Sequence, residues 1–279
     1  MCVKWGETIS AVFHVSNGVR QGGVLSPRLF NVYMDGLSSI LNCTSIGGSI
    51  AGSTVNHMMY ADDICIISLS SAGLQSLLNI CNDYCIEHEL VFNVKKSQCM
   101  FFRSSVNKKC GLPGLTLNGK PVEFIAEAKY LGVLLQSNLK TTVDVARQTR
   151  KFYMQANLLL RNFRYCTDNV KCVLFQAYCT NMYCCPMWYN STMSSLNKLR
   201  TSYNSVLRRL LFISRPYSAS AMFVCRGIPT FDEILRRSVH SFKQRIQSSH
   251  NTIIAGCLSL KVSMSSPIRK WWNSMLYIA

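Results

Sequence analysis

Apolar residues recur at helical spacing in two stretches of the first half of the chain, 28–41 and 74–89, and predict two amphipathic helices. β-prone segments lie before, between and after these helices, at 1–15, 46–69, 97–103 and 121–135. Glycine, proline and asparagine within 104–120 predict a turn-rich connection. This mixture of helices and short strands indicates an α+β fold for the first half.

The second half of the chain has a helical pattern throughout. Helices are predicted over 142–164, 168–186, 192–212 and 230–247. The first has an apolar stripe formed by Val145, Phe152, Ala156, Leu159 and Phe163, and the third has one formed by Leu196, Leu199, Tyr203, Val206 and Leu210. Polar residues interrupt the most apolar run, 172–189, so we expect a buried core helix there and no membrane-spanning segment.

The sequence also predicts how the two helices of the first half begin and which side of each is apolar. Ser26, followed by Pro27, is expected to cap the helix over 28–41. The apolar positions of that helix are Leu29, Val32, Tyr33, Leu37, Ile40 and Leu41. The segment 71–73 opens the helix over 74–89. Its apolar face comprises Leu74, Leu77, Leu78, Cys81, Tyr84 and Cys85.

The formal net charge of +17 is concentrated in the second half of the chain. Residues 1–139 contain 10 Lys and Arg against 9 Asp and Glu, whereas residues 140–279 contain 20 against 4. Basic residues flank two of the predicted apolar stripes, at Arg147, Arg150, Lys151, Arg161, Arg164, Lys198, Arg200, Arg208 and Arg209. Such basic helices are typical of proteins that bind nucleic-acid phosphates. A solvated basic surface is the alternative.

The 14 cysteines show no C-x-x-C spacing, so neither a zinc site nor a disulfide framework is expected. They are expected to serve as small buried hydrophobic residues in a reducing compartment. No basic-then-apolar signal segment is visible at the start of the sequence. We therefore expect an intracellular location, in the cytoplasm or the nucleus.

Two adjacent carboxylates interrupt an apolar, β-prone segment at Tyr60-Ala61-Asp62-Asp63. Burying an unpaired carboxylate costs several kcal/mol, so such a pair is normally neutralised by a metal, a partner or a proton. A hairpin with strands over 55–60 and 64–69 would place Asp62 and Asp63 at its tip, where both can reach one site. Hard oxygen ligands of this kind suit Mg²⁺. The alternative is an exposed turn, which aspartate also favours.

A glycine-rich loop, 16–27, precedes the first predicted helix. Its Gly22-Gly23 pair allows the backbone to approach a ligand closely or to adopt positive φ. The loop, the capped helix and the acidic hairpin form a constellation that is more specific than any one of its parts.

This constellation resembles the reverse transcriptases of non-LTR (LINE-type) retrotransposons. Gly18–Pro27 matches that family's motif B, and Tyr60–Asp63 matches motif C, the polymerase signature. Asn93–Ser97 is similar to motif D, and Lys129–Val133 is similar to motif E, the primer grip. Order and spacing agree across 16–135, and weaker similarity to the family's thumb covers most of the remainder.

The resemblance implies the architecture of a polymerase. Residues 1–139 would form a partial palm, an antiparallel sheet with packed helices. A basic, helical thumb over 140–212 would track the template–primer duplex, and 213–279 would be a helical post-thumb extension. The implied partners are an RNA template, a DNA primer and deoxynucleoside triphosphates, with no membrane; the oligomeric state is left open.

The resemblance also implies two-metal nucleotidyl transfer with Mg²⁺, or Mn²⁺ as the alternative. Asp62 would be the principal metal ligand and Asp63 its neighbour in the metal site. Template, nucleotide and primer-terminus contacts would come from Arg20, Gln21, Gly22, Gly23, Tyr60 and Ala61. Lys95 or Lys96 would neutralise or protonate the leaving pyrophosphate, unless both are surface lysines. Tyr130, Leu131 and Gly132 would support the primer, unless they form a buried strand.

One part of the family's pattern is missing. Motif A supplies a further metal-binding aspartate upstream of motif B, yet Glu7 is the one acidic residue before Gly18. The fingers and any endonuclease are also missing. We therefore expect a C-terminal fragment of a reverse transcriptase that is inactive alone. A non-catalytic nucleic-acid-binding remnant is the alternative, and a relic whose uncovered sheet edges prevent stable folding is a third.

Overall fold

The computed structural model describes residues 1–14, 18–102, 114–214 and 216–259 of the 279-residue chain. Contacts divide the chain into two units, one formed by Met1–Lys96 and Leu112–Val122, and the other by Ser97–Gly111 and Glu123–Ala279. Ser16 and Asn17 of the glycine loop lie outside the described residues, as do parts of the segments predicted at 97–103, 104–120 and 213–279.

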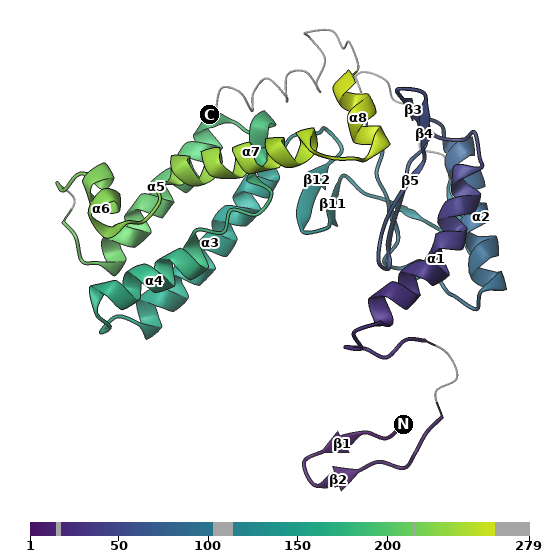
Figure 1. The fold of residues 1–279 in the computed structure, drawn as a ribbon, viewed down its shortest axis with the longest axis horizontal. Coiled ribbons are helices and arrows are strands. Elements are labelled where there is room, and N and C mark those ends of the chain that lie inside the picture. Colours follow the sequence, from purple (N-terminus) through teal and green to yellow (C-terminus); the bar gives the residue numbers. More distant parts are fainter. Residues whose placement is uncertain (15–17, 103–113, 215, 260–279) are drawn as a thin grey trace. The chain divides into compact units, whose positions relative to one another are not determined.

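The described residues of the first unit form two helices and four short hairpins. Helices α1 (Ser26–Asn42) and α2 (Ser71–Glu87) confirm the two predicted helices (Figure 1). The antiparallel hairpins are β1 (Lys4–Trp5) with β2 (Thr8–Ile9), β3 (Gly48–Ile50) with β4 (Ser53–Val55), β5 (His57–Tyr60) with β6 (Asp63–Ile66), and β8 (Thr116–Leu117) with β9 (Lys120–Pro121). The strand expected over 1–15 is thus only a hairpin of two-residue strands, because Gly6 at φ 58° turns the chain.

The core of this unit lies between α1, α2 and the β5–β6 hairpin. Leu37, Leu41 and Leu77 are fully buried. Met59 and Ile64, a cross-strand pair of the hairpin, pack against this core. The predicted apolar face of α2 is confirmed, since its buried residues are Leu77, Cys81, Tyr84 and Cys85.

The expected N-cap of α1 is wrong, and its apolar positions are only partly buried. Ser26 is the first helical residue rather than the cap: Leu25 is the N-cap, and the Ser26 hydroxyl donates to the Arg20 carbonyl instead. The buried side consists of Met34, Leu37 and Leu41. The predicted apolar positions that remain exposed are Leu29, Val32, Tyr33 and Ile40. They are exposed because α2 and the hairpin cover only one side of this helix.

The second unit joins two strand pairs to a set of helices. Its strands are β7 (Gln98–Cys99), β10 (Glu123–Phe124), β11 (Glu127–Tyr130) and β12 (Val133–Gln136). Its helical segments are α3 (Thr142–Asn162), α4 (Asp168–Cys179), the 3₁₀ turn η1 (Cys185–Asn190), α5 (Met193–Leu210), α6 (Ala219–Arg226), α7 (Phe231–Gln247) and α8 (Thr252–Ser259).

The α+β class is confirmed, but the expected single antiparallel sheet is not found among the described residues. The strands form separate two-stranded pairs, and β7 and β10 pair in parallel. A parallel pair needs a long connection, and residues 100–122 separate β7 from β10 in the sequence.

Aromatic rings form the centre of the second unit. Helices α3, α4 and α5 lie side by side (Figure 1), and the fully buried ring of Tyr203 packs among Phe152, Phe175, Phe223 and Phe231. The predicted stripes of α3 and α5 face this core. Helices were predicted correctly here because large apolar residues recur every three or four positions.

The helix predicted over 168–186 ends early, at Cys179. Cys184 has φ 56°, a conformation that no α-helix continues, and Pro186 follows within η1. The expected core helix over 172–189 is therefore α4, a loop and a 3₁₀ turn. No helix in the described part of the chain is long and apolar enough to cross a membrane.

The cysteines of the described ranges are free thiols, and the expectation that they are buried is correct for only some of them. Cys81, Cys85, Cys172, Cys179 and Cys185 are buried, whereas Cys2, Cys43 and Cys225 are exposed. Burial raises the pKa of Cys81 and of Cys179 to about 12, so these thiols stay protonated at neutral pH.

Candidate functional site

The paired aspartates lie at the end of the β5–β6 hairpin. Tyr60 pairs with Asp63, so the connecting turn consists of Ala61 and Asp62, with Ala61 at φ 52°. The hairpin was predicted, but its strands are shorter than expected and Asp63 is the first residue of β6. Both carboxylates are exposed to solvent, as is 67% of Tyr60. The tip is therefore accessible to a ligand.

Buried polar contacts hold this hairpin on α1. The Asn56 amide, 1% exposed, donates to the Leu41 carbonyl at 2.7 Å and to the Thr44 hydroxyl at 2.9 Å. The neighbouring His57 ring contacts the Asn56 amide oxygen at 2.7 Å and the Ser38 hydroxyl at 2.8 Å. Burial lowers the pKa of His57, which keeps the ring neutral between these partners. The sequence analysis did not identify these anchors, because their partners lie 12 to 19 residues away.

The described part of the glycine loop is a tight turn in front of α1. Gly22 has φ 78°, and the Gly23 amide donates to the Arg20 carbonyl at 3.0 Å. A Cβ atom on Gly23 would lie 2.5 Å from the Ser26 hydroxyl and 3.1 Å from the Arg20 carbonyl. Both glycines are therefore required by the turn itself, one for its φ and the other for space. Arg20 and Gln21 are exposed.

Lys95 and Lys96 lie in a turn after α2 and are both exposed. The Lys96 amide donates to the Asn93 carbonyl at 3.0 Å, which closes this turn. Both lysines belong to the first unit, together with the glycine loop and the acidic hairpin.

The hairpin tip carries two adjacent carboxylates that could ligate a metal ion. Two adjacent carboxylates match the oxygen ligands that Mg²⁺ prefers. Within the described ranges, however, no group of three His, Cys, Asp or Glu side chains could hold a metal ion. Asp62 and Asp63 are thus two carboxylates that could contribute oxygen ligands to such a site.

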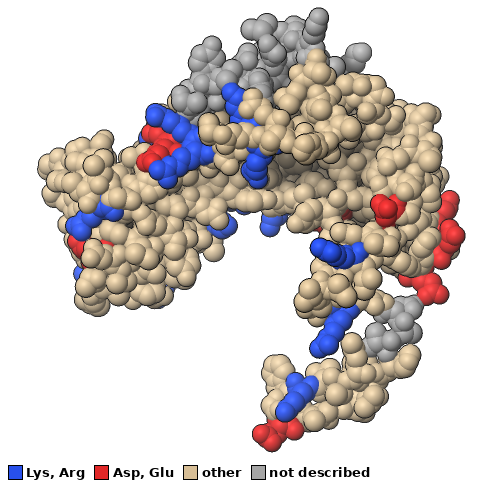
Figure 2. Space-filling model, in the orientation of Figure 1, with Lys and Arg blue, Asp and Glu red and all other residues tan. Residues whose placement is uncertain are grey.

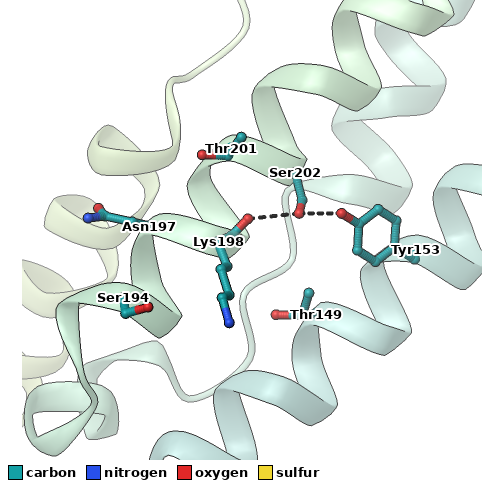
Figure 3. Close-up of a pocket in the computed structure, with 7 residues that line it drawn as sticks. All are labelled: Thr149, Tyr153, Ser194, Asn197, Lys198, Thr201 and Ser202. Atoms are coloured by element: carbon teal, nitrogen blue, oxygen red, sulfur yellow. Dashed lines mark hydrogen bonds between the residues drawn. The ribbon is translucent and has the colours of Figure 1, made fainter.

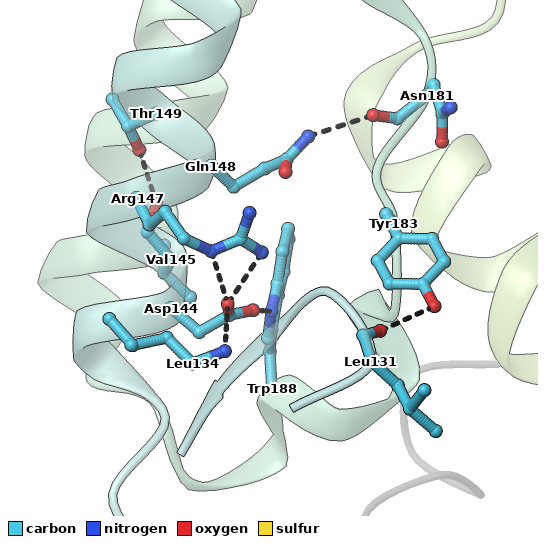
Figure 4. A network of polar contacts seen from close by, with 10 residues as sticks. All are labelled: Leu131, Leu134, Asp144, Val145, Arg147, Gln148, Thr149, Asn181, Tyr183 and Trp188. Atoms are coloured by element: carbon cyan, nitrogen blue, oxygen red, sulfur yellow. Dashed lines mark hydrogen bonds and ion pairs between the residues drawn. The ribbon is translucent and has the colours of Figure 1, made fainter. Parts of the chain in front are cut away.

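The proposed primer grip lies in the second unit, at the tip of the β11–β12 hairpin. Tyr130 is the last residue of β11, and Leu131 and Gly132 form the turn with φ 44° and 81°. The Leu131 carbonyl accepts a hydrogen bond of 2.9 Å from the Tyr183 hydroxyl (Figure 4). The three residues thus form a hairpin end, in which Leu131 is 38% exposed, rather than the interior of a buried strand.

A buried carboxylate connects the same hairpin to the helices. Asp144, 1% exposed, accepts hydrogen bonds from the Leu134 amide at 3.0 Å and from the Trp188 indole at 2.9 Å (Figure 4). It also forms an ion pair with Arg147 at 2.7 Å. Arg147 was expected on a basic surface, but its guanidinium group pairs with the buried Asp144 carboxylate. The sequence shows Asp144 only as a rare acid in a basic region.

All four acidic residues of 140–279 form ion pairs with arginine. The pairs are Asp144–Arg147, Asp168–Arg226, Asp232–Arg200 and Glu233–Arg237. Figure 2 shows that red atoms on the helical unit lie beside blue ones, while further blue areas have no red neighbour. The basic excess of this unit is thus carried by the remaining Lys and Arg side chains.

A polar groove runs between α3 and α5. It is open to solvent, has a volume of about 810 Å³, and is lined by Thr149, Tyr153, Ser194, Asn197, Lys198, Thr201 and Ser202 (Figure 3). The lining side chains thus bear hydroxyl groups, one amide and one cation, with no carboxylate among them. Hydroxyl and ammonium donors are the groups that commonly contact phosphate oxygens.

Comparison with known proteins identifies a domain within this chain. Residues 3–135 match the sequence profile of the family described as reverse transcriptase (RNA-dependent DNA polymerase). The RNA-directed DNA polymerase from mobile element jockey of Drosophila funebris is 25% identical over 261 residues, which cover 88% of this chain and 27% of that protein. The jockey polymerase of Drosophila melanogaster is 26% identical over 260 residues, with the same coverage.

A third relative matches a shorter segment. The Pol polyprotein from type-2 retrotransposable element R2DM of Drosophila melanogaster is 33% identical over 101 residues, 36% of this chain and 10% of that protein. The chain therefore carries a reverse transcriptase domain. That domain is homologous to those of non-LTR retrotransposon RNA-directed DNA polymerases. The chain spans about a quarter of the length of the jockey polymerases it matches.

Proposed function

We propose that this chain forms part of an RNA-directed DNA polymerase, which extends a DNA primer with deoxynucleoside triphosphates on an RNA template. The observation that carries the proposal is the family match over 3–135, which includes the intact Tyr60-Ala61-Asp62-Asp63 segment. The exposure of both carboxylates at an anchored hairpin tip supports it. In this role Asp62 and Asp63 hold Mg²⁺, or Mn²⁺, which stabilises charge on phosphoryl oxygens when bound.

The proposal also gives roles to the other site residues. Arg20, Gln21 and the two glycines of the loop contact the incoming nucleotide and template base, where the absence of a Cβ permits close approach. Lys95 or Lys96, both solvent-exposed, neutralises or protonates the leaving pyrophosphate. The β11–β12 tip contacts the primer, and the α3–α5 groove contacts the duplex backbone.

In this proposal the chain is a fragment of the polymerase and comprises palm, thumb and post-thumb parts. Two carboxylate donors without a third among the described residues support a site that is incomplete here. We expect the purified chain to give no primer extension on an RNA template with Mg²⁺. The measurement is gel analysis of a labelled primer, with Asp62→Ala as background. Extension by the wild-type chain that Asp62→Ala abolishes would contradict the fragment proposal and support the polymerase.

Nucleic-acid binding is the second expectation, and a non-catalytic binding remnant is the alternative function. It is favoured by the basic excess that remains after all four acids of 140–279 are paired. With about four phosphate contacts, the affinity for an RNA–DNA hybrid should fall about 100-fold between 50 and 200 mM salt. Fluorescence anisotropy over a salt series measures this slope. No binding at 50 mM salt would contradict both functions.

A further inference from the structure

The β11–β12 hairpin is attached to the helical segments at two separate points. At its tip, the Leu131 carbonyl accepts the hydrogen bond of the Tyr183 hydroxyl. In its second strand, the Leu134 amide donates to Asp144 of α3. The two attachments come from different elements, because Tyr183 lies in the loop between α4 and η1.

The two attachments differ in burial. Asp144 is 1% exposed and also binds Arg147 and Trp188, so it belongs to the core of the unit. Tyr183 is 45% exposed, and its ring lies 3.0 Å from the point where a Cβ on Gly132 would be. The ring thus rests against the turn, and the hydroxyl bonds to it. Through this hydrogen bond and this ring contact, Tyr183 supports the tip of the hairpin.

The turn needs such support. A two-stranded hairpin is marginally stable by itself in water. Leu131 has φ 44°, a region that side chains other than glycine occupy at an energetic cost. An external contact that favours this conformation therefore raises the population of the correctly folded turn.

We propose that Tyr183 is a positioning residue that holds the tip Tyr130-Leu131-Gly132 in its turn, so that the helical unit sets the geometry of the primer contact. The step from hairpin to primer rests on the proposed function; the step from Tyr183 to hairpin rests on the contacts alone. Tyr183 therefore acts through the turn, and it is not itself a catalytic residue.

Tyr183→Phe in the full chain is the sharpest test, because it removes one hydroxyl and keeps the ring. Tyr178→Phe is the matched control: this tyrosine lies on α4, is 50% exposed, and makes no hydrogen bond through its hydroxyl to the described residues. Hydrogen–deuterium exchange with mass spectrometry reports the hairpin peptide, 127–136. We expect about fivefold faster exchange there in Tyr183→Phe, with the peptides of α3 and α5 unchanged.

A second readout measures contact between the hairpin and the primer. A photoreactive nucleotide at the primer's 3′ end should cross-link to peptide 127–136 less in Tyr183→Phe than in Tyr178→Phe, with equal affinity for the hybrid. Equal hairpin exchange in both variants would overturn the proposal, as would faster exchange of every peptide, which marks a merely structural role. Faster hairpin exchange with unchanged cross-linking would keep Tyr183 as an anchor and refute the primer contact.

Discussion

Replacing Asp62 by asparagine is expected to lower primer extension at least about 10³-fold, on the order of 4 kcal/mol, in a polymerase that contains this chain. The suitable enzyme is a chimaera in which the chain replaces the 261 aligned residues of the Drosophila funebris jockey polymerase. Asparagine keeps the size of the side chain but removes its charge. The loss should therefore appear in the rate of extension with Mg²⁺, measured in a single turnover.

The control for this variant is Asp83→Asn, the same change on the exposed side of α2. It should leave extension within about twofold of the chimaera, since isolated surface charges contribute little. A chimaera that extends primers equally well with Asp62→Asn would refute the assignment of the hairpin as the metal-binding site.

Replacing Asp144 by alanine is expected to destabilise the second unit by about 3–5 kcal/mol. The change leaves the partly buried Arg147 guanidinium, the Trp188 indole and the Leu134 amide without their shared acceptor. Breaking a buried pair is costly because the remaining charge stays desolvated. Urea denaturation followed by circular dichroism measures the loss as a lower midpoint.

Asp168→Ala is the comparison for this variant. Asp168 also pairs with an arginine, Arg226, but its side chain is 42% exposed. Its loss should cost about 1 kcal/mol or less, because solvent screens the pair. Equal destabilisation by the two substitutions would show that burial of Asp144 does not increase the cost of losing its ion pair.

Periodicity predicted the helices well where a helix has one clear apolar side. Helix α5 is an example, since Leu199, Tyr203 and Val206 are buried as expected. Helix α1 is the counterexample: Leu29 and Val32 are apolar but exposed. Spacing shows which residues share a side, but it does not show which neighbours cover that side.

The candidate site was predictable where it is formed by residues that are close in sequence. The hairpin at Asp62 and Asp63 follows from neighbouring residues, and so does the turn at Gly22. The contacts of Asn56, Asp144 and Tyr183 were missed, because they join residues distant in sequence and carry no local signal. The parallel pairing of β7 with β10 was missed for the same reason.

The attachment of the β11–β12 hairpin has a consequence for synthesis on the ribosome. Tyr183 follows Leu131 by 52 residues, and Trp188 follows Asp144 by 44. At roughly 5–20 residues per second, the hairpin exists for about 3–10 s before its tip anchor has been translated. During that interval the nascent chain carries a hairpin whose turn still lacks its hydrogen bond to Tyr183.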